Sequence, residues 1–157
     1  MNYKLFVVLS ILLVAGCGNS TGLKDFTYKY SMESAGNFKV EFQLNPDSSY
    51  AISQNNYFFD RFEGASRPVE KEGVLSQQEF EKFRELISKS GINKMDDSYG
   101  FEEEENSDNS IMYVVELIQN GESKFVSINA GSRQDFPKAF TGLIEYTNDY
   151  INVNLKQ

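Results

Sequence analysis

Histidine and tryptophan are absent from this chain of 157 residues, and cysteine occurs only at position 17. The absence of histidine excludes catalytic triads and proton shuttles that use imidazole, and it excludes histidine-ligated metals. A single cysteine cannot form an intramolecular disulfide, so packing must stabilise any folded domain. Glycine-rich phosphate-binding runs of the G-x-x-x-x-G-K-[ST] and G-x-G-x-x-G types are also missing. These absences remove most of the common catalytic and nucleotide-binding machinery, and no cofactor is expected.

The N-terminus has the layout of a signal peptide. Lys4 precedes an apolar run over residues 5–14 that only Ser10 interrupts. This run is shorter than the roughly 20 residues that a membrane-spanning helix needs, and it fits the h-region of a signal peptide. Val14-Ala15-Gly16-Cys17 then resembles the lipobox of bacterial lipoproteins. The resemblance implies cleavage before Cys17, lipid such as palmitate on its thiol, and a protein held on a membrane surface by that lipid.

The predicted organisation follows from this signal. Residues 1–16 are the signal peptide, residues 17–24 are the lipidated cysteine and a small, polar tether, and residues 25–157 form a single α+β domain. Because Gly18, and not an acidic residue, follows the cysteine, the rules for lipoproteins favour the outer membrane, facing the periplasm or the cell surface, over the inner membrane.

The composition limits the classes of partner. Removal of residues 1–16 leaves 14 Lys and Arg against 23 Asp and Glu, which is a net side-chain charge of −9. A surface of this sign repels phosphate backbones, so nucleic acid is excluded as a partner. The membrane is expected as a partner through the lipid on Cys17, and an envelope protein is the expected further partner.

Period-two alternation of apolar and polar residues predicts strands over residues 26–32, 38–44, 50–55 and 67–74. Ser76 and Glu79 form a capping box before a helix over residues 77–90, which Gly91 ends. An apolar run over residues 111–118 and a second run over residues 123–129 predict a hairpin around Asn120-Gly121. A last helix opens near Pro137. The fold class is therefore α+β, an antiparallel sheet of about six strands with two helices packed on one face, in the order ββββ-α-ββ-α.

The runs EGVLSQQEFEKF and MDDSYG, followed by a hairpin and a terminal helix, are similar to uncharacterised domains of other bacterial envelope lipoproteins. The similarity covers about residues 38–152. It implies a compact α+β fold and carries no activity.

Acidic residues are the first candidates for a site. The segment 96–108 contains four consecutive glutamates and could supply oxygen ligands to calcium, with Asp96, Asp97, Glu102 and Asp108 as the candidates. Its spacing departs from the D-x-[DN]-x-[DN]-G loop, and such a run also fits a solvated charged loop. A pair of carboxylates could instead serve a hydrolase. No motif supports either reading.

Tyr57, Phe58, Phe59 and Phe62 form the densest aromatic cluster. Strand alternation would bury about half of these side chains, and at least one of the three consecutive aromatics must point outward or lie in a bend. The cluster is therefore a candidate interaction patch, since aromatics are enriched in binding hot spots.

The sequence favours a membrane-anchored bacterial lipoprotein that is not an enzyme and serves as a protein-binding or accessory module of the cell envelope. A weak cation or small-ligand binder using residues 96–108 is the first alternative, and a carboxylate-dependent hydrolase is the second. Cys17 is the lipidation site, and no catalytic residue is assigned.

Overall fold

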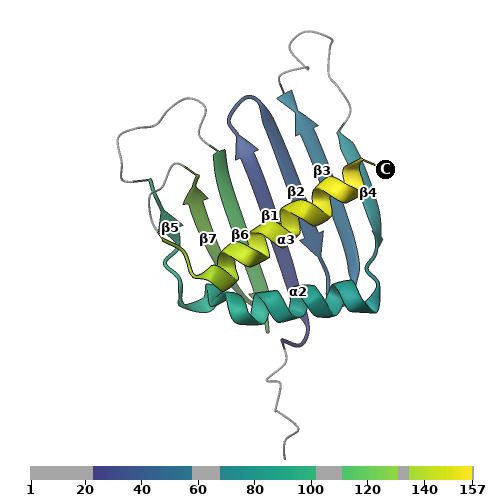
Figure 1. Cartoon of the computed structure of the whole chain (residues 1–157), viewed down its shortest axis with the longest axis vertical. Coiled ribbons are helices and arrows are strands. Elements are labelled where there is room, and N and C mark those ends of the chain that lie inside the picture. Colours follow the sequence, from purple (N-terminus) through teal and green to yellow (C-terminus); the bar gives the residue numbers. More distant parts are fainter. Residues whose placement is uncertain (1–22, 58–67, 102–110, 131–134, 157) are drawn as a thin grey trace, which may run out of the picture.

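A computed structural model describes residues 23–57, 68–101, 111–130 and 135–156. Within them, seven strands form one sheet, and two α-helices lie across one face of it (Figure 1). The strands are β1 (Phe26–Ser34), β2 (Phe38–Leu44), β3 (Ser49–Asn56), β4 (Val69–Val74), β5 (Ser98–Tyr99), β6 (Ile111–Gln119) and β7 (Glu122–Asn129). The helices are α2 (Gln77–Ser90) and α3 (Lys138–Leu155), and a short 3-10 helix, η1 (Ile92–Lys94), follows α2. The two-layer α+β architecture is confirmed.

The sheet corrects two details of the expected fold. Its order is β4-β3-β2-β1-β6-β7-β5, and β5 pairs with β7 in parallel, so the sheet has seven strands and is mixed. The additional strand, Ser98–Tyr99, is too short to show period-two alternation. Its position depends on long-range contacts: the ring of Tyr99 packs against Phe136 with centroids 5.2 Å apart.

Two turns have the local geometry that their residues predict. Between β2 and β3, Ser48 has a φ of 69°, and Asp47 Oδ1 accepts a hydrogen bond from the Ser49 backbone N–H at 3.0 Å. Between β6 and β7, Asn120 and Gly121 have φ values of 54° and 80°. Positive φ at both central residues is the type I′ geometry, which matches the twist of a hairpin.

The capping box of α2 is confirmed. Ser76 Oγ accepts a hydrogen bond from the Glu79 N–H at 3.3 Å, and Glu79 Oε2 accepts one from the Ser76 N–H at 2.9 Å. Gly91 ends the helix with a φ of 74°, a conformation that costs glycine nothing. On the face toward the sheet, Phe83 and Ile87 are buried. Helix α3 follows Pro137 and buries Phe140, Leu143, Thr147 and Ile151.

The core lies between the sheet and the two helices, and aromatic rings dominate it. Phe83 packs against the rings of four residues: Tyr28, Phe42, Tyr146 and Tyr150. The buried tyrosine hydroxyls on β1 are hydrogen-bonded to α3. Tyr28 Oη lies 3.0 Å from Thr147 Oγ1, and Tyr30 Oη donates to Asn148 Oδ1 at 2.6 Å. Because Thr147 Oγ1 donates its one proton to the Leu143 carbonyl at 2.8 Å, Tyr28 is the donor to Thr147.

Gly73 in β4 lies against the ring of Tyr50 on the adjacent strand. A Cβ atom at Gly73 would lie 2.8 Å from Tyr50 Cε1 and Oη. That ring is held in turn by an edge-on contact with Tyr150, with centroids 5.4 Å apart. We therefore expect Gly73→Ala to lower the free energy of unfolding by about 1–3 kcal/mol, measured by urea denaturation.

Gly142→Ala is the matched control, since nothing lies within 4 Å of a Cβ at this position in α3. Alanine is the better helix former, so this substitution is expected to raise the free energy of unfolding by about 0.5–1 kcal/mol. A Gly73→Ala variant as stable as the parent chain would show that the Tyr50 ring can be displaced at no cost.

Candidate functional site

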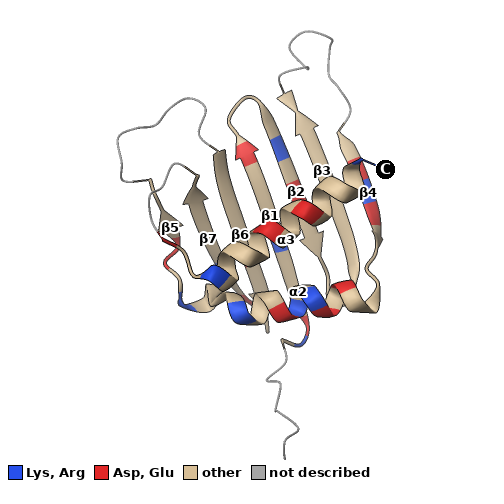
Figure 2. Cartoon of the chain, in the orientation of Figure 1, with Lys and Arg blue, Asp and Glu red and all other residues tan. Residues whose placement is uncertain are grey.

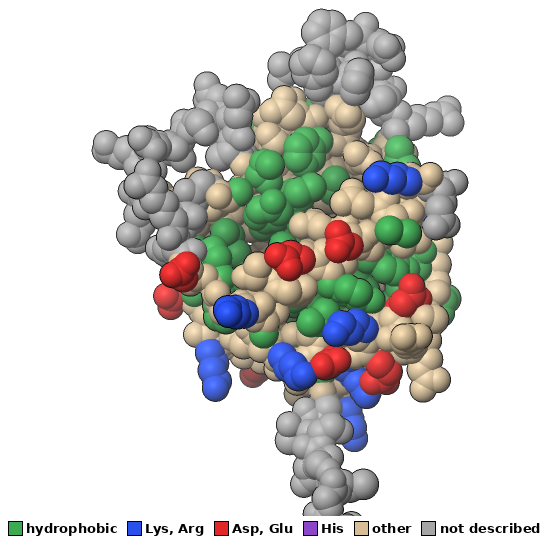
Figure 3. Space-filling model, viewed as in Figure 1, with side chains coloured by type: hydrophobic (Ala, Val, Ile, Leu, Met, Phe, Trp, Pro, Cys, Tyr) green, Lys and Arg blue, Asp and Glu red, His purple; other side chains and the backbone are tan. Residues whose placement is uncertain are grey.

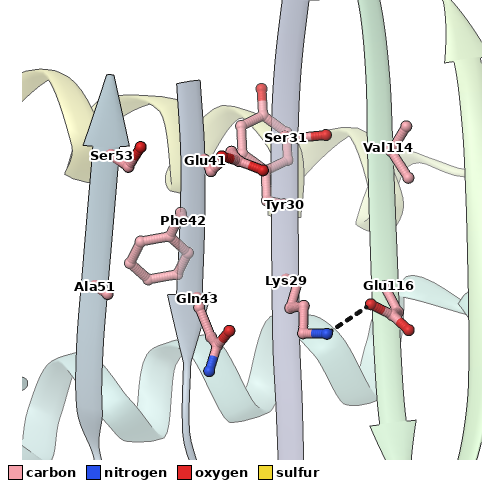
Figure 4. A pocket seen from close by; sticks show the side chains of 10 residues that line it. All are labelled: Lys29, Tyr30, Ser31, Glu41, Phe42, Gln43, Ala51, Ser53, Val114 and Glu116. Carbon is pink, nitrogen blue, oxygen red and sulfur yellow. Dashed lines mark hydrogen bonds and ion pairs between the residues drawn. The ribbon is translucent and has the colours of Figure 1, made fainter. Parts of the chain in front are cut away.

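The helices leave the other face of the sheet bare within the described residues, and we call it the open face. A shallow hollow of about 370 Å³ lies on it, across β1, β2, β3 and β6 (Figure 4). Its residues are Lys29, Tyr30, Ser31, Glu41, Phe42, Gln43, Ala51, Ser53, Val114 and Glu116. Tyr30 and Phe42 contribute backbone only, because their side chains are buried in the core. The hollow forms where the short side chains of Ser31, Ala51 and Ser53 meet longer neighbours.

An ionic network borders the hollow. Lys29 and Glu116 are direct cross-strand partners on β1 and β6, with Lys29 Nζ 3.0 Å from Glu116 Oε2. Ser123 Oγ on β7 donates to Glu116 Oε1 at 2.6 Å. The hydrogen bond from Ser123, with that from Lys29, holds the pKa of the Glu116 carboxyl below its usual range. Glu116 is therefore ionised at neutral pH and serves as a fixed acceptor.

The open face is acidic. The pairing register places two lysines and five glutamates on it within the strands: Lys29, Lys39, Glu33, Glu41, Glu70, Glu72 and Glu116. Lys39 Nζ is engaged by Glu41 at 2.8 Å. The apolar residue Phe125 adds a ring that is 49% exposed. The charged side chains of the open-face strands therefore carry a net charge of −3.

Glu41 and Glu116 are the two carboxylates of the hollow, so a hydrolase site there would depend on this pair. They lie on β2 and β6, on either side of β1, and their positions differ by two residues along that strand. Strand spacing and rise then separate their Cα atoms by about 12 Å. Glu116 is directed to Lys29 (Figure 4). The Glu116 carboxylate is thus already bound by Lys29 and Ser123, and the hydrolase alternative stays a prediction.

Two further hollows lie outside the open face. On the helix-covered side, apolar side chains are visible above α3 (Figure 3). A mainly apolar hollow of about 260 Å³ borders the start of α3, lined by Tyr113, Ile128, Asn129, Ala130, Phe136, Phe140, Thr141 and Ile144. A hollow of about 420 Å³ lies beside Leu23 and the end of α2, where Lys89 and Lys94 border it.

The sequence-predicted residues are only partly described. Cys17 and the aromatic residues Phe58, Phe59 and Phe62 lie outside the described residues. Tyr57 directly follows β3 and is half-buried. The lipidation site and the aromatic patch therefore stay predictions.

The candidate calcium ligands are also only partly among the described residues. Asp97 forms an ion pair with Lys124, and the Asp96 backbone N–H donates to Tyr99 Oη at 2.8 Å. Glu102 and Asp108 lie outside the described residues. In the part of the chain that the structure describes, no group of three or more acidic, cysteine or histidine residues could hold a metal ion. The cation site stays a prediction.

The sequence analysis missed the hollow and its Lys29–Glu116 pair. Alternation places Lys29 and Ser31 on one face of a strand, but it does not show that β1 lies between β2 and β6. The available signal was the absence of large apolar residues from the solvent-side positions of β1 and β3, namely Thr27, Lys29, Ser31, Ala51 and Ser53.

No protein-family model matches the chain, and no curated protein matches it. None of the helices in the described ranges is long and apolar enough to cross a membrane.

Proposed function

We propose that this chain is a bacterial envelope lipoprotein, anchored by lipid on Cys17, whose folded part is a non-catalytic module that binds another protein through the open face of its sheet. The observation that carries the proposal is the hollow on that face, opposite the helices, with the Lys29–Glu116 ion pair beside it. The signal-peptide pattern and the resemblance of residues 14–17 to a lipobox support the anchor. The expected location is the outer membrane.

The chemistry of the open face supports binding over catalysis. Glu116 is held ionised by Ser123 and Lys29, so it cannot act as a general acid at neutral pH. The chain also has no histidine that could serve as a general base. A shallow surface with a fixed ion pair and excess negative charge suits a protein partner with a basic patch.

The test is cross-linking in intact cells with a tagged copy of the chain, followed by identification of the captured protein. We expect one envelope protein to be captured reproducibly and to be lost with Cys17→Ser, because the unanchored chain leaves the membrane. Ser53→Arg fills the hollow and is expected to reduce capture at least tenfold. Gln78→Arg places an arginine on the exposed side of α2, away from the hollows described above, and should leave capture unchanged.

Equal loss of capture in both arginine variants would argue against the open face as the binding surface. Absence of any captured protein would argue against a protein partner, and calcium titration of the chain would then test the cation alternative at residues 96–108.

A further inference from the structure

Strand β4 is an open edge of the sheet. It pairs with β3 along all six of its residues, from Val69 to Val74, and in the described residues no strand pairs with its other side. At the opposite edge, the two residues of β5 pair only with Ser127 and Ile128 of β7, so the preceding residues of β7 also lack an outer strand among the described residues. There Lys124 forms an ion pair with Asp97 and η1 lies against β7, whereas β4 offers six consecutive residues to an added strand.

The side chains of β4 hold it in an extended, accessible conformation. On the helix side, Lys71 Nζ donates to the Asn154 carbonyl at the end of α3 at 2.9 Å, and the Tyr50 ring covers Gly73. On the open face, Glu70 and Glu72 are exposed. Figure 2 shows that both signs of charge lie on this strand at the edge of the sheet. The edge therefore presents two glutamates at alternate positions.

Charge disfavours a second copy of this chain as an added antiparallel strand. Two β4 strands that pair antiparallel about a twofold axis perpendicular to the sheet keep like faces together, so open-face residues stand opposite open-face residues. In the register centred on Lys71, Glu70 of each copy lies opposite Glu72 of the other copy. A shift of two residues either way places Glu70 opposite Glu70 or Glu72 opposite Glu72. Like charges directly opposite each other destabilise a strand pair, so every such register is unfavourable.

We propose that β4 accepts an extended segment of a different protein as an added strand, and that this segment carries Lys or Arg at the alternate positions that face Glu70 and Glu72. Main-chain hydrogen bonds to the β4 edge can form with any extended segment. The cross-strand ion pairs with Glu70 and Glu72 then select a basic segment. The proposal rests on the proposed function only in that the domain binds protein, and it concerns the edge of the sheet, not the hollow.

The first experiment measures binding of synthetic eight-residue peptides to the whole chain in detergent by fluorescence anisotropy. The probe alternates Lys and Thr, and its control alternates Glu and Thr. We expect the lysine peptide to bind at least tenfold more tightly and to slow amide hydrogen exchange of β4. Glu70→Gln/Glu72→Gln should weaken its binding about fivefold or more. Glu81→Gln/Glu145→Gln removes the same charge from exposed positions on the two helices and should leave the affinity for the lysine peptide unchanged.

Backbone methylation separates strand addition from ionic attraction. Only alternate amides of an added strand point toward β4, so N-methylation of either the Lys or the Thr residues should abolish binding, while methylation of the other set should preserve it. Equal binding of both methylated peptides would overturn the added strand. Failure of the lysine peptide to bind, or equal binding of the glutamate peptide, would overturn the basic partner and leave the test of the hollow unaffected.

Discussion

Replacement of Phe83 by alanine is expected to lower the free energy of unfolding by about 3–5 kcal/mol. Phe83 is fully buried, and its ring centroid lies 4.8 Å from that of Tyr146 and 5.3 Å from that of Phe42. It therefore joins α2 to both α3 and the sheet. Its removal leaves a cavity whose rigid aromatic walls can close only in part. Because the free energy of unfolding of a domain is about 5–15 kcal/mol, this one change removes a large share of it.

The measurement is urea denaturation of the chain from residue 18 onward, which contains every described element. Phe125→Ala is the matched control, since the same ring is deleted from a side chain that is 49% exposed on the open face. The control should change the free energy of unfolding by less than about 1 kcal/mol. Equal losses in the two variants would contradict the placement of Phe83 at the centre of the core.

Alkaline pH is expected to unfold the domain through Tyr28 and Tyr30. Burial raises the pKa of both phenols well above the usual value of about 10. Above pH 10, the unfolded chain therefore loses phenolic protons that the folded chain keeps. Since the unfolded state then binds fewer protons, the free energy of unfolding falls as pH rises, by about 1.4 kcal/mol per pH unit for each tyrosine. Below pH 10 this contribution is fully present.

Urea midpoints measured from pH 6 to pH 12 check this expectation. The midpoint should be nearly constant from pH 6 to pH 9, because no histidine titrates in that range. Tyr28→Phe and Tyr30→Phe should each make the alkaline slope shallower, whereas the contributions of Tyr146 and Tyr150, whose pKa burial also raises, are common to all variants. A midpoint that stays constant to pH 12 in the parent chain would rule out the burial of these phenols.

Local patterns predicted most of the elements. The capping box at Ser76 and Glu79 gave the start of α2, and positive φ at Asn120 and Gly121 follows from the preference of those residues for a type I′ turn. Strands with one buried face, such as β1 and β2, carry their own period-two signal. Strand β5 carries none, because two residues form it and its position depends on β7 and Phe136.

The candidate site was less predictable than the fold, because it depends on which strands are neighbours. Lys29 and Glu116 are far apart in sequence, and only the position of β6 beside β1 makes them partners. Composition instead drew attention to the acidic residues 96–108 and to the aromatic residues 57–62, since local clusters are visible without the fold. Glu70 and Glu72 are a further case. Their alternation is visible in the sequence, but the sequence does not show that β4 lies at the edge of the sheet.

The first strand of the described residues, β1, lies inside the sheet, with β2 on one side and β6 on the other. A force applied to the chain ahead of Leu23 is therefore delivered to the interior of the sheet, along the axis of β1. Since ladder hydrogen bonds run perpendicular to the strands, such a load shears two ladders at once. The same load on an edge strand could break the hydrogen bonds of its single ladder one after another. The domain is thus joined to its N-terminal segment at the point where the sheet resists tension best.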